Sequence, residues 1–191
     1  MESPTKKITI REVTARVAES RYPMNSMGIQ LPYAYVAEAI DINWADVLFA
    51  IDNGYFDLQV AIEHAVAEVT KNESWPQEIE DLLGLAPYES YAIRPLVEKL
   101  VGSAPEHAGG TAKDRIMFVL LRWLFEHKQD YEDPPMLVEI VYADFGYPEE
   151  IKFFVRYTPI ELFENTTPTG VAGLYKNWKK YLKQKSATFK N

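Results

Sequence analysis

Four carboxylates lie close together in the second half of the sequence and are its best-placed metal ligands. Asp130, Glu132, Asp133 and Glu139 could supply the oxygen atoms that magnesium and calcium prefer. Their spacing matches no calcium-binding loop, and acids of this kind more often cap helices or face water. A metal-dependent hydrolase built on these acids is therefore an alternative rather than the favoured interpretation, and we expect no bound metal or cofactor.

The three histidines do not suggest a second metal site. His64, His107 and His127 are far apart in the sequence, and none belongs to a His-Glu-x-x-His pair. His64 falls on the apolar face of a predicted helix, which indicates a packing role. His127 falls in the last turn of its helix, where a positive charge suits the helix dipole.

Other catalytic chemistries lack their characteristic residues. The chain has no cysteine, no Gly-x-Ser-x-Gly turn and no phosphate-binding glycine loop beyond the pair Gly109-Gly110. Glu149 and Glu150 are adjacent, so on a helix they point about 100° apart and make a poor acid–base pair. An enzyme is therefore the less favoured class.

The stretch YADFGYPEE, which begins at Tyr142, is predicted to be a joint between two helices. If Phe145 ends one helix, Gly146 takes the left-handed conformation that closes helices, and Tyr147 packs against Tyr142. Pro148 then occupies the first position of the next helix, where its missing N–H costs nothing. The two glutamates that follow suit the positive end of that helix.

Charge is distributed unevenly along the chain. The formal net charge is −8, but residues 171–191 contain six lysines and no acid. The remainder therefore has 14 basic and 28 acidic residues, a net charge of −14. Such a body repels nucleic acid and attracts a basic partner. Solubility alone could also account for the acidity.

Length and composition fit one soluble domain. The chain has 191 residues, of which 47% are apolar, 25% charged and 13% aromatic. Without cysteine it cannot form disulfides. The N-terminal residues do not resemble a signal peptide, and the apolar run at 116–125 is half the length of a membrane span. We expect a cytoplasmic protein that binds neither membrane nor nucleic acid.

Helical periodicity and capping residues predict a mainly α fold of about seven helices in a single domain, residues 1–191. The run at 112–129 is apolar on almost every side, which predicts the central helix. Residues 1–42 are only loosely assigned and contain at most a minor strand near 7–13. Loops are predicted at 22–33, 102–113 and 161–170. The other predicted helices are 43–54, 57–72, 76–84, 88–101, 134–145, 148–158 and 171–185.

The last predicted helix is basic and amphipathic. Leu174, Trp178 and Leu182 share one side, and the lysines follow helical spacing on another. Helices of this kind can bind membranes or nucleic acid. Because the rest of the chain is strongly acidic, we expect this helix to dock on the protein itself.

Residues 118–159, FVLLRWLFEHKQDYEDPPMLVEIVYADFGYPEEIKFFVRYTP, resemble an uncharacterised bacterial family, the domain of unknown function 2247. The earlier segment WADVLFAIDNGYFD at 44–57 is similar to the same family, so the resemblance spans residues 43–159. Two details depart from the family pattern: Val141 is inserted before Tyr142, and Thr158 replaces a methionine. The family has no established activity, so the resemblance implies no catalytic residues. Small acidic proteins of such families often accompany bacterial toxins as immunity proteins.

These observations favour a non-enzymatic acidic binding protein, and they suggest an immunity protein that neutralises a basic, nuclease-type toxin domain. A scaffold or adaptor protein is the first alternative, and the hydrolase described above is the second. The residues expected to contact the protein partner are the acids and one tyrosine between positions 130 and 150, namely Asp130, Tyr131, Glu132, Asp133, Glu139, Asp144, Glu149 and Glu150.

Overall fold

The apolar run predicted to form the centre of the protein is helix α7, Ala112–Glu126, in a computed structural model of the chain. The structure describes residues 7–9, 12, 25–103, 110–156 and 170–189. Within these residues it is mainly helical, as predicted. The only β pairing that the described residues make is an isolated parallel bridge between Ile8 and Tyr131.

The elements before and after α7 have well-defined bounds. Before α7 they are α2 (Tyr33–Ala39), α3 (Trp44–Asp52), α4 (Gln59–Lys71), α5 (Gln77–Gly84), the 3-10 helix η1 (Pro87–Ala92) and α6 (Ile93–Ser103). After α7 they are α8 (Pro134–Asp144), the 3-10 helix η2 (Glu149–Phe154) and α9 (Val171–Phe189).

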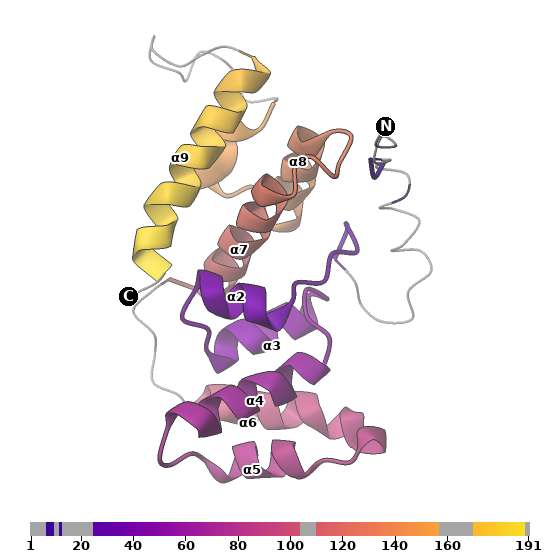
Figure 1. The fold of residues 1–191 in the computed structure, drawn as a ribbon, viewed down its shortest axis with the longest axis vertical. Helices are drawn as coiled ribbons and strands as arrows, with labels where there is room; N and C mark the ends of the chain where they lie inside the picture. Colours follow the sequence, from indigo (N-terminus) through magenta and orange to yellow (C-terminus); the bar gives the residue numbers. More distant parts are fainter. Residues whose placement is uncertain (1–6, 10–11, 13–24, 104–109, 157–169, 190–191) are drawn as a thin grey trace, which may run out of the picture.

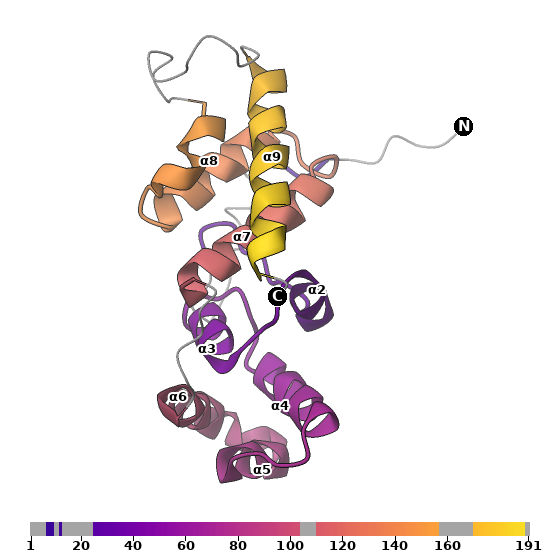
Figure 2. The ribbon, with the colours of Figure 1, turned by 90° about the vertical axis from the view of Figure 1, so that its left-hand side faces the viewer.

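The helices are stacked along one long axis, as both views show (Figures 1 and 2). At one end α8 and α9 pack on α7 and η2 packs on α8 and α9, and at the other end α5 packs on α4 and α6. Helix α3 contacts both α6 and α7, so it links the two ends. Its start follows from the sequence: Asn43 caps the helix by accepting a hydrogen bond from the N–H of Asp46 at 3.0 Å.

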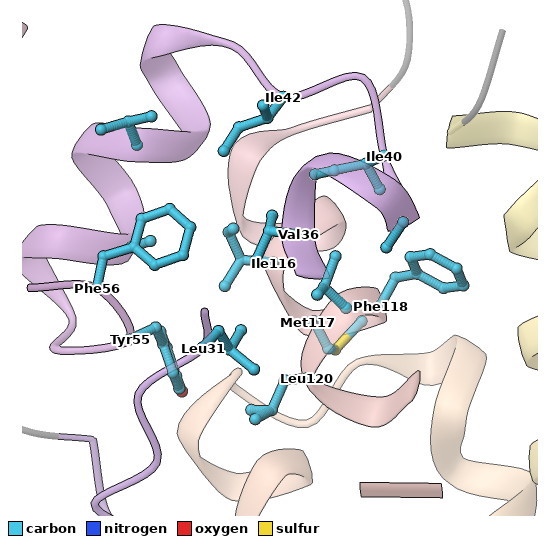
Figure 3. Packing of buried hydrophobic residues seen from close by; sticks show 14 of the residues in the cluster. Leu31, Val36, Ile40, Ile42, Tyr55, Phe56, Ile116, Met117, Phe118 and Leu120 are labelled. Carbon is cyan, nitrogen blue, oxygen red and sulfur yellow. The ribbon is translucent and has the colours of Figure 1, made fainter. Parts of the chain in front are cut away.

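The core is continuous through the middle of the molecule. Ile116, Met117, Phe118 and Leu120 of α7 are buried and pack beside Val36 and other apolar residues of the α2–α4 region (Figure 3). A helix that buries this much of its circumference must be enclosed by neighbours, as the sequence predicted. These neighbours are α3, α8 and α9. Helix α3 also contacts α6, α6 contacts α5, and α4 contacts α2 and α5.

Three predicted elements differ from the structure. Helix α2 lies in the loosely assigned first 42 residues and was not predicted. The helix predicted at 88–101 is two elements, η1 and α6, with Pro95 in the first turn of α6. The α-helix predicted at 148–158 is instead the shorter 3-10 helix η2. A 3-10 helix brings residues three apart to one side, and this buries Ile151 and Phe154 together. Parts of the loops predicted at 22–33, 102–113 and 161–170 lie outside the described residues.

The predicted joint after α8 is confirmed in most details. Phe145 follows the last residue of α8, and Gly146 has φ +73°. The N–H of Tyr147 donates to the carbonyl of Tyr142 at 2.7 Å, and the two rings meet edge to face. Tyr147 is itself left-handed, with φ +60°, which was not predicted. Pro148 is the N-cap of η2 rather than its first helical residue.

The basic C-terminal helix docks on the protein, as expected. Trp178 and Tyr181 of α9 are buried against α7 and η2, and Lys185 forms an ion pair with Glu150 at 2.6 Å. The helix is longer than predicted and ends at the buried Phe189. Four lysines on its other side are exposed: Lys176, Lys179, Lys180 and Lys183.

A buried ion pair joins α3 to α7. The Nε of Arg115 donates to both carboxylate oxygens of Asp46 at 3.0 Å, and an Nη of Arg115 donates to the carbonyl of Asp41. Both side chains are almost fully buried, at 4% and 0% exposure. Removing one partner of a buried pair leaves the other charge without compensation in a medium that solvates it poorly.

We expect Arg115→Met to lower the free energy of unfolding by about 3–5 kcal/mol, because the Asp46 carboxylate then stays buried without its partner. Urea unfolding followed by circular dichroism measures this. Arg94→Met is the control, since Arg94 pairs with Asp52 and Glu98 on the surface and its loss should leave the midpoint unchanged. Equal midpoints for the two variants would contradict the role given to the buried pair.

Gly146→Ala should destabilise the protein by about 1–2 kcal/mol, because a Cβ is strained in the left-handed conformation. Its Cβ would make only an ordinary contact, with Lys113 Nζ at 3.5 Å, so the expected loss comes from the backbone. Gly84→Ala is the matched control: it ends α5, has no positive φ and meets nothing within 4 Å. The prediction is wrong if both variants unfold at the wild-type urea concentration.

Candidate partner-binding surface

The acids of α8 predicted to face a partner are engaged within the protein. Arg156 forms ion pairs with Asp133 at 2.8 Å and with Glu139, and Asp133 also caps α8 by accepting from the N–H of Met136. Hydrogen bonding to Glu139 and Asp133 raises the pKa of the Arg156 guanidinium despite partial desolvation. Asp133 and Glu139 thus hold the segment after η2 against α8, and a guanidinium occupies the space between them.

The three acids around the joint also have partners. Asp144 accepts a hydrogen bond from the Ser26 hydroxyl at 2.7 Å. Glu149 pairs with Lys152, and Glu150 pairs with Lys185. These contacts fix the loop before α2, the helix η2 and α9 respectively, so their carboxylates already have structural roles.

The remaining predicted residues lie between α7 and α8. Tyr131 is buried, with 8% of its surface exposed, so it cannot serve as an exposed anchor. Its neighbours Asp130 and Glu132 are exposed, although their backbones pair with Ile8: the Ile8 N–H donates to the carbonyl of Asp130, and the Glu132 N–H donates to the carbonyl of Ile8. A role for these two acids in binding stays a prediction.

No metal centre is apparent in the part of the chain that the structure describes. It contains no group of three or more histidine, aspartate, glutamate or cysteine side chains arranged to hold a metal ion. His127 stacks on Trp123 with ring centroids 3.9 Å apart and follows the last residue of α7. His107 lies outside the described residues.

His64 is a packing residue, as predicted, and it joins three helices. It is 2% exposed, its ring contacts Trp44 at a centroid distance of 4.5 Å, and its Nδ1 hydrogen bonds to the Tyr33 hydroxyl at 3.0 Å. Within the described part of the protein its Nε2 is buried and has no hydrogen-bond partner. Burial lowers the pKa of His64 to about 4, with a smaller contribution from Lys71 that Asp41 opposes. The imidazole is therefore neutral at pH 7.

A second acidic region, at residues 72–92, was not recognised from the sequence. It contains five acids and no lysine, arginine or histidine: Glu73, Glu78, Glu80, Asp81 and Glu89. No ion pair within the described residues involves any of them. The absence of basic residues over these 21 positions is visible in the sequence. The net charge of −14, which covers all of residues 1–170, does not reveal it.

The structure and sequence together define an all-helical protein without a recognisable catalytic centre in its described residues. The chain belongs to DUF2247, a family described as uncharacterised proteins conserved in bacteria, whose model matches residues 33–186. This match extends beyond the resemblance at 43–159 in both directions. Comparisons with curated proteins and with solved structures gave no match. No helix among the described residues is long and apolar enough to span a membrane.

The buried imidazole predicts a loss of stability in mild acid. The pKa of His64 falls from about 6.5 in the unfolded chain to about 4 in the folded protein, so the unfolded chain binds the extra proton between these values. The stability that the neutral His64 side chain contributes is fully present above pH 6.5 and is lost as the pH falls towards 4. Between pH 7 and pH 5 this amounts to about 2 kcal/mol.

Urea unfolding at the two pH values, compared between wild type and His64→Phe, measures this contribution. The phenylalanine keeps an aromatic ring beside Trp44 and cannot take up a proton, so the variant should lose less stability on acidification. The explanation fails if wild type and His64→Phe lose the same free energy between pH 7 and pH 5.

Proposed function

We propose that this chain is a non-enzymatic binding protein that acts in the cytoplasm by neutralising a basic partner, a nuclease-type bacterial toxin domain. The observation that supports this most directly is the group of carboxylates on and around α5 and η1 that form no ion pair within the described residues. Glu80 and Asp81 accept hydrogen bonds from the neutral Gln77, and Glu89 accepts one from the N–H of Ala86, so their negative charge is not neutralised. Four acids near α8 and α9, Asp133, Glu139, Glu149 and Glu150, have cationic partners, whereas the five acids at 72–92 form no ion pair within the described residues.

An excess of surface charge that no cation neutralises favours a partner of the opposite sign. Complementary charges increase the rate at which two proteins meet and exclude partners of like charge. Nucleic acid is such an excluded partner, because binding it requires clustered lysine or arginine. A basic domain that itself binds nucleic acid has the complementary surface, and an acidic protein seated on that surface blocks access to phosphate.

The test is co-expression with the protein encoded immediately upstream of this chain's gene. We expect an affinity tag on this chain to retain that protein, and we expect the chain to protect cells from its toxicity. The control for nonspecific attraction is an unrelated acidic protein of similar net charge that carries the same affinity tag. Failure to retain the protein, together with failure to protect, contradicts the proposal.

The salt dependence of the same interaction gives a second measurement. If charge guides the encounter, the association rate constant should fall by about tenfold or more between low salt and 0.3 M salt, because exposed charges are screened within a few ångströms at that concentration. The dissociation rate constant should change much less. A complex whose association rate is independent of salt would not be explained by the acidic surface.

A further inference from the structure

The region around α5 and η1 exposes large apolar side chains as well as acids. Tyr88 and Tyr91 are 81% and 77% exposed, and Trp75 and Leu83 are exposed to smaller extents. Large exposed apolar residues are less frequent over the rest of the described chain. The α5–η1 surface is defined here by the apolar side chains Trp75, Leu83, Tyr88 and Tyr91 and the acids Glu78, Glu80, Asp81 and Glu89.

The fold does not need these tyrosines. Helix η1 buries none of its residues, and α5 is anchored through only Ile79 and Leu82. Tyr88 and Tyr91 are one turn apart in η1. Helix α5 contacts α4 and α6, and η1 contacts α6. These contacts hold both elements in place, so the two tyrosines project from a well-packed part of the fold. Tyrosine brings a large contact area and a hydroxyl at a small entropic cost, and it is therefore common among residues that dominate binding energy.

The position of the α5–η1 surface favours docking of another protein. Helix α5 lies at one end of the long axis, and α8 and α9 lie towards the other, in both views (Figures 1 and 2). The exposed lysines of α9 are thus remote, and the nearby Arg94 is engaged with Asp52 and Glu98. Glu80 and Asp81 of α5 are exposed, because Ile79 and Leu82 face the core on the other side of the helix.

Resting on the proposed function, we propose that the basic partner docks on the α5–η1 surface, with Tyr88 and Tyr91 as its anchors. The acids Glu80 and Asp81 form a negative rim that matches lysines and arginines on the partner. Aromatic anchors surrounded by a polar rim are the usual arrangement of a protein interface. The inference assigns the contact to residues 75–91 instead of the acids between 130 and 150.

The experiment compares four variants for binding to the protein encoded immediately upstream, by surface plasmon resonance. Tyr88→Ala/Tyr91→Ala should raise the Kd by about 30-fold or more, mainly through faster dissociation. Glu80→Lys/Asp81→Lys should slow association by about tenfold. The two α5–η1 variants should unfold close to the wild-type urea concentration, because the four changed side chains are exposed. Urea unfolding of Tyr147→Ala measures separately what its contact with Tyr142 contributes.

The matched controls lie at the other end of the molecule. Asp130→Lys/Glu132→Lys makes the same change in net charge on exposed acids, and Tyr147→Ala removes an exposed tyrosine. Both should keep the Kd within about threefold of wild type, as interface studies find for residues outside the contact. If these controls weaken binding and the α5–η1 variants do not, the docking site is wrong although the proposed function stands.

Two other results also overturn the inference. If wild type binds and all four variants bind equally well, the partner contacts neither surface through these residues. If wild type does not bind the upstream protein but self-associates in low salt, by sedimentation velocity, the occupant is the lysine face of a second copy. If wild type forms no complex with the upstream protein, the proposed function is wrong as well as the docking surface. If wild type binds and only the α5–η1 variants behave like wild type, the docking surface alone is wrong.

Discussion

The buried ion pair between Asp46 and Arg115 is the constraint on which the arrangement of the helices depends. It joins α3 to α7, and α3 is the helix that supports α6 and, through α6, α5 and η1. The carboxylate also accepts a hydrogen bond from the N–H of Asn43, so it closes the first turn of α3 as well. An ion pair that is buried at both ends tolerates little rotation, because an unpaired charge in the interior is costly. It therefore fixes the rotation of α3 about its axis and, with it, the orientation of the helices beyond.

The C-terminal end of the chain is tied to the same point. The N–H of Asp41 donates to the carbonyl of Phe189 at 3.1 Å, and the Arg115 guanidinium lies 5.9 Å from the Phe189 ring. Three segments that are distant in the sequence thus converge around one guanidinium. Apolar packing of α7 supplies most of the stabilising burial, but apolar contacts alone are compatible with several helix orientations. The ion pair and its hydrogen bonds select one of them.

The sequence predicted the elements whose signals are local. Asn43 capping α3, the all-round apolar run of α7 and the glycine after α8 each act within a few residues, so their patterns sufficed. It did not predict α2, whose seven residues carry no capping side chain, or the 3-10 geometry of η2. It also gave no sign of the buried pair, because Asp46 and Arg115 are 69 residues apart and each is an ordinary surface residue by type.

The candidate site was harder to predict for the same reason. The sequence predicts exposed acids between 130 and 150, but Arg156, Lys152 and Lys185 neutralise four of them, and Arg156 is 23 residues from its partner Asp133. A count of acids does not distinguish a carboxylate that holds two helices together from one that faces water. The region at 72–92 differs in that its segment contains no cation to form such a pair. The local absence of lysine and arginine was a better signal in the sequence than the abundance of acid, but only the structure shows that no distant cation among the described residues pairs with these acids.

Charge and aromatic residues contribute to different stages of binding, and this explains why a surface that combines them suits an inhibitor. Attraction between exposed charges acts over about 8 Å at physiological salt, so it affects how often two proteins meet more than how long they stay together. The lifetime of a complex depends on contacts that exclude water, which exposed tyrosines can make and isolated carboxylates cannot. A protein that must neutralise a damaging partner before it acts requires both a fast encounter and a slow release. The acids of α5 and the tyrosines of η1 lie next to each other in the sequence on a supported end of the fold, where one partner surface can contact both.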